Sequence, residues 1–465
     1  MALPSTGAIS AADVVSQWRK PAGTTVSFNQ LDFYRLGEKT SAGTISFSDL
    51  RGKYFFWGRS LPASSVCAVN PNTGHLYYKV QNSAGYSYFG RTNIATGSSD
   101  LLKRSTDYKA VSTSDSDMYV TTDNYLVTGS QVSSSYFRCA VYDANLAYQS
   151  GSTTYYGQVM SSAIKPNTTL ANTAITLAVA SLAAPHVALF NGSSVLQWTI
   201  KSPIVGVWNS AIAQDTSGNI YHAYTTGGGY NHTYASARLM LNKLNSSGTK
   251  QWGKEISALN NKCDVSVDSS GNIYLCGDYF SSNYRGLVYK LDTNGNTIWS
   301  RHMYSSNGGV KCRNVVSDSQ GNVYVLANAP RLVSGSWLNG YMVVKFNSSG
   351  TLQWKADISY STSANDNGGS LTVDYDDNVF VIAECDAKGY PILKIPATSS
   401  PVGFSYPLTV DTFSFVANTD TTVTSTSETT ITNNSETYTS ASFSTSINTP
   451  TIIDSTLSTE VVEMV

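Results

Sequence analysis

A turn-forming stretch recurs about every fifty residues along the chain, and this recurrence constrains the fold more than any other feature. It reads DTSGNIY at 215–221, DSSGNIY at 268–274, DSQGNVY at 318–324 and DYDDNVF at 374–380. Each copy ends in a β-branched and an aromatic residue, as expected where a tight turn leads into a strand. We therefore expect each copy to be the turn of a β-hairpin.

A second turn follows within three of these units, as KLNSSGTKQW at 243–252, KLDTNGNTIW at 290–299 and KFNSSGTLQW at 345–354. Two tight turns per unit define four antiparallel strands, and such a unit repeated at this period is typical of a β-propeller blade. Weaker copies at 70–78, at 114–120 with 142–148, and at 190–198 bring the count to seven. The sequence thus predicts a mainly β fold with a seven-bladed β-propeller over residues 54–410.

The last unit needs a strand from elsewhere in the chain. It reaches Lys394 without an obvious fourth strand, whereas YFFWGRS at 54–60 resembles the fourth-strand pattern TIWSRHM at 297–303. We expect Tyr54–Ser60 to complete the last blade and close the ring, which removes the open sheet edges that invite aggregation.

The charge balance argues against electrostatic partners. The 465 residues carry a formal net charge of −1, and only 13% of them are charged, which does not favour binding to nucleic acid or to an anionic membrane. The most apolar window, Ala174–Phe190, contains a proline and is too short to span a bilayer, so no membrane insertion is expected. The six cysteines lack metal-ligand spacing, and we expect buried free thiols.

Neither a metal site nor a catalytic site is evident in the sequence. The run Asp292–Asn296 supplies oxygen atoms but lacks the closing carboxylate of a calcium-binding EF-hand, so we expect its side chains to cap the turn. None of the five histidines stands in a catalytic or metal-binding motif. We predict a protein that is not an enzyme and that has no cofactor or metal.

The expected connections between the second and third strands combine Gly or Ser with aromatic residues in six units, at 81–91, 129–138, 225–234, 278–286, 333–341 and 386–390. If both tight turns of a blade lie on one face of the disc, these connections lie on the other. Rigid rings among small polar residues favour contact with a protein or a glycan. The alternative is that some of these rings belong to the third strand and pack between blades. The candidate contact residues are Tyr86, Tyr88, Tyr136, Tyr230, His232, Tyr234, Tyr284, Arg285, Trp337, Tyr341 and Tyr390.

The first 53 residues contain three short copies of another signal, in which a β-branched residue precedes Ser and an acid or amide follows three positions later. This pattern resembles a helix capping box and predicts a strand end that runs into one or two helical turns. The residues concerned, which we expect to form a small α+β anchoring segment, are Ile9, Ser10, Asp13, Val26, Ser27, Ile45, Ser46, Asp49 and Leu50. A helical cap over the end of the propeller is the alternative.

The composition changes abruptly at the other end of the chain. Among the 55 residues 411–465, 26 are Ser or Thr, and no Lys or Arg follows Lys394. Such a segment is either a disordered linker or an extended β element that orders against a neighbour. The β-branched and aromatic run at 437–447 favours the second reading, and 450–465 regains the apolar residues of a docking peptide.

The N-terminal segment resembles that of known proteins. MALPSTGAISAADV, together with GTISFSDLRGK at 43–53, resembles the N-terminal segments of virion proteins of tailed bacteriophages, especially tail, baseplate and fibre-associated proteins of cyanophages. The resemblance covers residues 1–53, and the middle copy TTVSFNQLDFYRLG departs from it by lacking the leading glycine. It implies a virion protein assembled in the host cytoplasm, anchored to other virion proteins and homo-oligomeric in the particle.

The resemblance does not extend to the propeller behind this segment. We expect a structural component of the virion that displays a propeller to a protein or to the host surface. The alternatives are a carbohydrate-binding, lectin-like propeller and, less favoured, a propeller enzyme that degrades polysaccharides.

Overall fold

The structure is a computed structural model of the 465-residue chain. It describes residues 58–61, 66–70, 72–81, 86–93, 99–108, 118–133, 136–152, 154–156, 158–181, 184–203, 207–226, 238–257, 259–280, 284–333, 335–359, 369–383, 390–397, 400–401, 405–407, 412–417, 422–424, 431–433, 439–440, 445–446 and 452–454.

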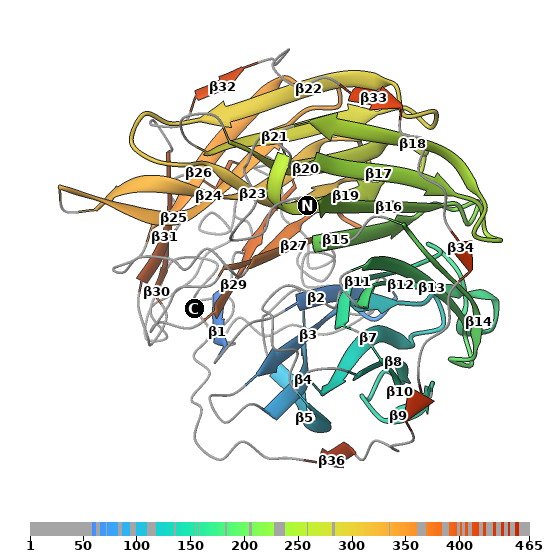
Figure 1. Cartoon of the computed structure of the whole chain (residues 1–465). Helices are drawn as coiled ribbons and strands as arrows, with labels where there is room; N and C mark the ends of the chain where they lie inside the picture. Colours follow the sequence, from blue (N-terminus) through green and yellow to red (C-terminus); the bar gives the residue numbers. More distant parts are fainter. Residues whose placement is uncertain are drawn as a thin grey trace, which may run out of the picture.

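Seven antiparallel sheets are arranged as the blades of a β-propeller (Figure 1). From the centre outward, blade 1 consists of β2 (Val66–Asn70), β3 (His75–Gln81), β4 (Tyr86–Asn93) and β5 (Ser99–Tyr108). Blade 2 consists of β6 (Met118–Val120), β7 (Leu126–Ser133) and β8 (Tyr136–Tyr142), and β9 (Tyr148–Gly151) and β10 (Thr154–Tyr156) pair with opposite ends of β8. Blade 3 consists of β11 (Gln158–Ile164), β12 (Ala174–Ser181), β13 (Ala184–Asn191) and β14 (Leu196–Lys201). A short 3₁₀ helix, η1 (Leu170–Asn172), precedes β12.

Blades 4 to 7 follow in chain order. Blade 4 consists of β15 (Val207–Gln214), β16 (Ile220–Thr226), β17 (Arg238–Leu244) and β18 (Lys250–Ser257), and blade 5 of β19 (Leu259–Val267), β20 (Ile273–Phe280), β21 (Tyr284–Leu291) and β22 (Thr297–Tyr304). Blade 6 consists of β23 (Lys311–Ser317), β24 (Val323–Val333), β25 (Ser336–Phe346) and β26 (Leu352–Ser359). Blade 7 contains β27 (Gly369–Val373), β28 (Val379–Ala383) and β29 (Tyr390–Ile395). The seven-bladed propeller predicted from the repeats is therefore confirmed.

Blade 7 takes its outermost strand from the first of the described residues. Strand β1 (Gly58–Leu61) pairs antiparallel with β29, with Gly58 opposite Leu393 and Leu61 opposite Tyr390. The ring is thus closed by hydrogen bonds between strands from its two ends. The expected closing strand, 54–60, overlaps β1 at Gly58–Ser60, and Tyr54–Trp57 lie outside the described residues.

The C-terminal region supplies a further outer strand to six blades in reverse order. Figure 1 shows these short strands along the rim of the disc. We call them together the belt. They are β31 (Thr412–Ala417) on blade 6, β32 (Thr422–Thr424) on blade 5, β33 (Ile431–Asn433) on blade 4, β34 (Thr439–Ser440) on blade 3, β35 (Thr445–Ser446) on blade 2 and β36 (Ile452–Asp454) on blade 1. Strand β30 (Ser405–Pro407) forms a hairpin with β31.

The recurring turn motif is held by its first residue, as expected for turn capping. In blade 4, Asp215 Oδ1 accepts hydrogen bonds from the backbone N–H groups of Ser217 at 2.9 Å and Asn219 at 2.8 Å. Gly218 adopts a φ of +83°, which glycine reaches without a steric penalty. Asp215 Oδ2 accepts from the hydroxyl of Tyr221 at 3.1 Å, and the Lys243 ammonium lies 5.3 Å from the centre of that ring.

The same stack of Asp, Tyr and Lys recurs as Asp268, Tyr274 and Lys290 in blade 5 and as Asp318, Tyr324 and Lys345 in blade 6. The spacing of the sequence repeat therefore corresponds to a structural stack within each blade.

In blades 4 and 5, the Lys and Trp of the second motif fasten the blade to the next one. Trp252 Nε1 and Lys243 Nζ of blade 4 both donate to the carbonyl oxygen of Thr293 in blade 5, at 3.2 and 3.1 Å. In blade 5, Trp299 Nε1 and Lys290 Nζ donate to the carbonyl of Ser348 in blade 6, at 3.1 and 3.2 Å. One turn carbonyl thus receives two donors from the neighbouring blade.

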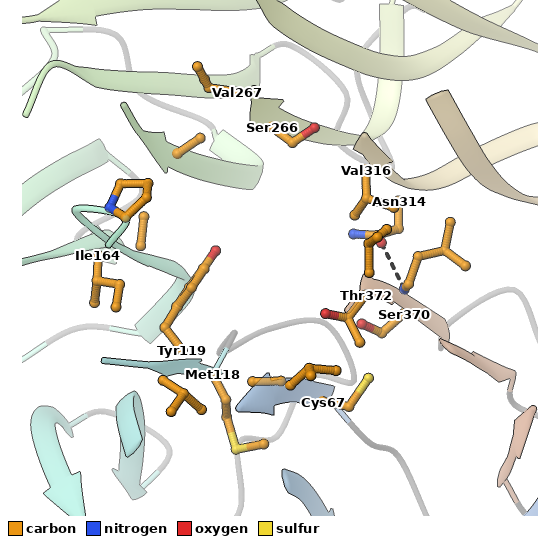
Figure 2. A pocket seen from close by; sticks show the side chains of 18 of the residues that line it. Cys67, Met118, Tyr119, Ile164, Ser266, Val267, Asn314, Val316, Ser370 and Thr372 are labelled. Carbon is orange, nitrogen blue, oxygen red and sulfur yellow. Dashed lines mark hydrogen bonds between the residues drawn. The ribbon is translucent and has the colours of Figure 1, made fainter. Parts of the chain in front are cut away.

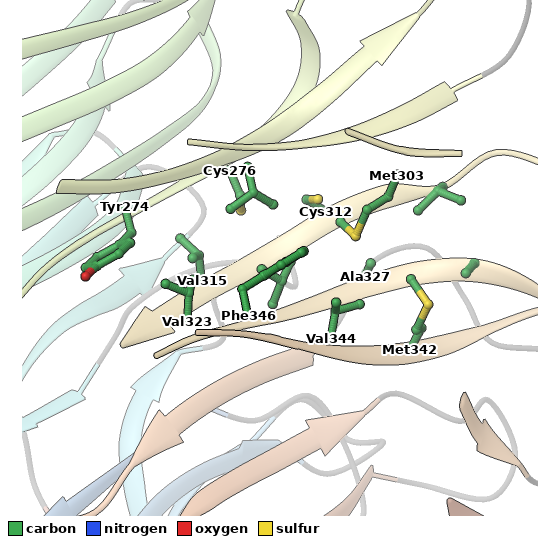
Figure 3. Packing of buried hydrophobic residues seen from close by; sticks show 14 of the residues in the cluster. Tyr274, Cys276, Met303, Cys312, Val315, Val323, Ala327, Met342, Val344 and Phe346 are labelled. Carbon is green, nitrogen blue, oxygen red and sulfur yellow. The ribbon is translucent and has the colours of Figure 1, made fainter. Parts of the chain in front are cut away.

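Apolar side chains fill the spaces between the blades. Figure 3 shows the cluster between blades 5 and 6, where Cys276 and Met303 of blade 5 pack with Val315, Val344 and other residues of the next sheet. Close packing of this kind is the main source of stability in such a ring. Free, buried thiols are found at Cys67, Cys139, Cys263, Cys276 and Cys312, as expected, and Cys385 lies outside the described residues.

Candidate functional site

The third strand of each blade begins on one face of the disc. The two tight turns of a blade lie on the opposite face, which we call the turn face; the face that carries the connections between second and third strands is the connection face. Tyr86, Tyr136, Tyr284 and Tyr390 are the first residues of β4, β8, β21 and β29, and Trp337 is the second residue of β25. Because all blades run in the same direction, these backbone positions lie along the connection face.

The side chains of the candidates divide into two groups. Trp337 is 43% exposed, and Tyr136, Tyr284 and Arg285 are half-buried. Tyr341, in contrast, is fully buried in a cluster with Leu326 of blade 6 and residues of blade 7. The prediction that Tyr341 belongs to the contact surface is therefore wrong, because β25 already begins at Ser336 and carries this ring between the blades.

The remaining candidates are described in part or not at all. Only the strand positions are described for Tyr86 and Tyr88 in β4 and for Tyr390 in β29. Three contact candidates lie outside the described residues, namely Tyr230, His232 and Tyr234. The anchoring candidates lie outside them as well; these are Ile9, Ser10, Asp13, Val26, Ser27, Ile45, Ser46, Asp49 and Leu50.

Cations and aromatic rings alternate at the connection-face end of blade 5. We call Phe280, Tyr284, Arg285, His302, Tyr304 and Lys311 the cation–aromatic cluster. The Lys311 ammonium lies 4.6 Å from the centre of the Tyr284 ring, which in turn makes an edge contact with Phe280 at 5.0 Å between ring centres. The guanidinium of Arg285 lies 5.5 Å from the centre of the Tyr304 ring. Such pairs hold the cations in place by the electrostatic attraction of the ring faces.

His302 adds a polar group to this cluster. Arg285 Nη1 lies 3.4 Å from His302 Nε2, with the guanidinium as the donor. The His302 ring also contacts Tyr304 in a tilted arrangement, with 5.0 Å between the ring centres. A surface of half-buried rings and cations of this kind presents donors and flat apolar faces together, which suits acidic or hydroxyl-rich partners.

A buried ion pair lies at the junction of blades 5 and 6. Arg313 Nη1 on β23 lies 3.4 Å from Asp278 Oδ2 on β20, and both side chains are almost completely buried. Arg313 Nε also donates to the side-chain oxygen of Asn328 on β24. Burial raises the pKa of Asp278 to about 7, although the charges of Arg313 and Lys311 act in the opposite direction.

Sequence reasoning identified Tyr284 and Arg285 but missed Asp278, His302, Lys311 and Arg313. A signal did exist, since Asp278 interrupts an otherwise apolar strand. A single charged residue in one strand does not reveal its partner in the next blade, however.

His222 in blade 4 is enclosed and forms a hydrogen bond with a serine side chain. His222 Nε2 lies 2.8 Å from Ser210 Oγ, and His222 is completely buried between strands. Burial lowers the pKa of His222 to about 3, so the ring is neutral. A buried Ser and His pair of this kind offers no access to a substrate, and it serves as an internal hydrogen bond.

The inner strands of all seven blades surround a central cavity of about 400 Å³ (Figure 2). Its wall combines apolar residues such as Ile164 and Val316 with hydroxyl groups, among them those of Ser266 and Thr372. Because its lining includes turn residues 166–167 and 374–375, the cavity lies toward the turn face. Gln214 also lines the cavity, and the buried amide nitrogen and oxygen of its side chain have no hydrogen-bond partner among the described residues.

Polar side chains of the inner strands connect successive blades around this cavity. Asn209 Oδ1 of blade 4 accepts from the N–H of Cys263, Asp264 Oδ2 of blade 5 accepts from Val315, and Asn314 Oδ1 of blade 6 accepts from Leu371, at 2.8 to 3.0 Å. Asn314 Nδ2 also donates to Asp264 Oδ2 at 2.7 Å. These bonds fix the inner strands to one another.

Within the described part of the chain, no three His, Cys, Asp or Glu side chains are grouped so that they could hold a metal ion. The same residues form no helix of the length and apolar character that spanning a membrane requires.

Neither a protein-family model nor a curated relative matches this sequence. A chain of the mitotic checkpoint complex is 9% identical over 73% of this chain and 90% of its own, with a TM-score of 0.46. The polysaccharide lyase Uly1 is 9% identical over 72% and 90%, with a TM-score of 0.43. A mutant lectin of Aleuria aurantia in complex with Fucalpha1-6GlcNAc is 11% identical over 73% and 98%, with a TM-score of 0.36. At these identities and TM-scores, none of the three argues for a function.

Proposed function

We propose that this chain is a non-enzymatic component of a tailed-phage virion, attached to the tail or baseplate through residues 1–53 and presenting the connection face of its propeller to a protein or to the host surface. The attachment rests on the resemblance of GAISAADV and GTISFSDL to virion anchoring segments.

The position of strand β1 supports this arrangement of an N-terminal anchor and a displayed propeller. Strand β1, which directly follows the N-terminal segment, is the outermost strand of blade 7. The chain therefore enters the propeller at its rim, and an anchor attached there leaves both faces of the disc available for contacts.

The test is to locate the chain in purified phage particles of the source. Antibodies raised against the propeller, used with cryo-electron microscopy of intact particles, are expected to label the tail or baseplate at a constant position. Deletion of residues 1–53 is expected to remove the label while leaving the propeller folded. Absence of the chain from purified particles would overturn the virion role.

A second candidate function is recognition of a glycan, and the cation–aromatic cluster with the exposed Trp337 favours it. Sugar rings stack on aromatic faces, and cations beside them bind carboxylates or hydroxyls. Binding of the full chain to a glycan array is expected to be lost in Trp337→Ala and Tyr284→Ala.

The matched control for these variants is Tyr375→Ala. Tyr375 is 41% exposed but follows β27 on the turn face, so the variant is expected to bind as the natural chain does. Equal loss of binding in all three variants, or no binding by the natural chain itself, would rule out glycan recognition at this face.

A further inference from the structure

The belt is bound to the propeller by short backbone pairings. The register pairs four residues of β31 with blade 6, three of β32 and three of β33 with blades 5 and 4, two of β34 and two of β35 with blades 3 and 2, and three of β36 with blade 1. Among the belt strands that the structure describes, only β31 has a second described support, the hairpin with β30. The belt is therefore most firmly held on blade 6 and rests on few hydrogen bonds elsewhere.

The composition of the belt region gives it no core of its own. Nearly half of residues 411–465 are Ser or Thr, and successive belt strands begin six to ten residues apart. An isolated two- or three-residue strand is not stable in water. Each belt strand therefore stays in place because its neighbours along the chain keep it at a high effective concentration near its blade.

The blades, in contrast, are complete without the belt. Their inner strands are packed by the clusters between blades, and the outer strand of each blade offers a sheet edge that pairs with any strand of suitable register. A belt from another copy of the chain would make the same hydrogen bonds with the same six edges. Exchange of identical elements between copies is a low-cost route to assembly for this reason.

From these observations we propose that the belt is exchangeable: strands β33 to β36 of one copy bind to the outer edges of blades 4 to 1 of a second copy and join the two. The root at β30 and β31 stays on blade 6 of its own ring. The proposal concerns the isolated protein and does not depend on a role in a virion.

The experiment uses two full-length variants with different tags, produced together in one cell. One carries Lys201→Cys on β14 and the other Thr439→Cys on β34; these two positions are paired in the register. The Cα atoms of paired residues in antiparallel strands lie within the range that a disulfide bridges. Mild oxidation is expected to join the two tagged chains, at least tenfold more than in the natural chain, whose described cysteines are buried.

The matched control replaces Thr439→Cys by Val423→Cys. Val423 pairs with Met303 of blade 5, so it is not expected to reach Cys at position 201 in either arrangement. A further variant carries both Lys201→Cys and Thr439→Cys in one chain. Disulfide formation within this chain shows whether β34 pairs with β14.

Disulfide formation within the doubly substituted chain, without any joining of the two tagged chains, would overturn the exchange, because it would show that the belt stays on its own ring. Absence of both products would overturn it as well, since β34 would then not pair with β14. Equal joining in the control would show random collision of chains and would also contradict the proposal.

Discussion

Asp278 on blade 5 and Arg313 on blade 6 form an ion pair with 3.4 Å between Oδ2 and Nη1, and both side chains are almost completely buried. The second carboxylate oxygen of Asp278 has no hydrogen-bond partner among the described residues. Removing a carboxylate from water costs more free energy than one ion pair of this length returns, which explains why the pKa of Asp278 is raised to about 7.

The stability of the propeller is expected to depend on pH through Asp278. Its carboxyl keeps a proton in the folded state up to a pKa of about 7, whereas the unfolded chain releases that proton near pH 4. Between these values the folded state binds more protons, so the contribution of Asp278 to stability is complete below about pH 4 and is lost as the pH rises to about 7.

Thermal or denaturant unfolding of the natural chain and of Asp278→Asn measures this effect, because other titrating groups cancel in the difference. The natural chain is expected to lose about 2–4 kcal/mol relative to the variant between pH 4 and pH 8. A difference that does not change with pH would contradict the raised pKa.

The bonds between inner strands are expected to contribute to stability. In Asn314→Leu, the N–H of Leu371 loses its acceptor and Asp264 loses a donor. The expected cost is about 1–3 kcal/mol in the free energy of unfolding, measured with urea. Gln251→Leu, which alters an exposed amide on β18, serves as the control and is expected to change stability by less than about 0.5 kcal/mol. Similar values for the two variants would show that the Asn314 bonds add nothing.

Substitution of two glycines with positive φ distinguishes the stability cost of backbone strain from the cost of steric crowding. Gly350 has a φ of +78° and Gly335 a φ of +84°. A Cβ at Gly350 would lie 2.7 Å from the Trp299 ring, whereas one at Gly335 would meet no atom within 4 Å. Both Gly→Ala variants are expected to lose about 1 kcal/mol from the backbone term, and Gly350→Ala a further 1–3 kcal/mol, roughly, from crowding. Equal losses in chemical denaturation would mean that Trp299 moves aside freely.

The opposite positions of Trp337 and Tyr341 predict opposite effects of substitution. Tyr341→Ala is expected to lower the free energy of unfolding by about 3–5 kcal/mol, because the ring is buried between blades 6 and 7. Trp337→Ala is expected to change stability by less than about 1 kcal/mol. Calorimetric melting of the two variants compares them directly, and a large loss in Trp337→Ala would place that side chain in the core instead.

The repeats predicted the blades because their chemistry is local. The Asp215 side chain and the backbone N–H groups that donate hydrogen bonds to it lie within four residues, so the turn could be inferred from the sequence. The bond from Trp252 to the Thr293 carbonyl spans 41 residues and depends on how the blades meet. The sequence showed the Lys and Trp of the second motif, but it did not show which backbone carbonyl accepts their hydrogen bonds.

Surface and core aromatics could not be separated in advance for a similar reason. The connection expected at 333–341 is mostly strand, since β24 ends at Val333 and β25 begins at Ser336. A shift of the strand boundary by a few residues moves a ring such as Tyr341 from the surface to the interior. The boundary depends on the hairpin partner, which propensity alone does not specify.

Closure of the ring by β1 has a consequence for synthesis on the ribosome. Leu61 emerges early, but its partner Tyr390 is translated 329 residues later. At translation rates of about 5–20 residues per second, the first strand waits roughly 15–70 s before it can pair. During that interval blades form in order from blade 1 while blade 7 is incomplete, and the nascent chain depends on its own slow, sequential folding or on chaperones to keep the open ring from associating with other chains.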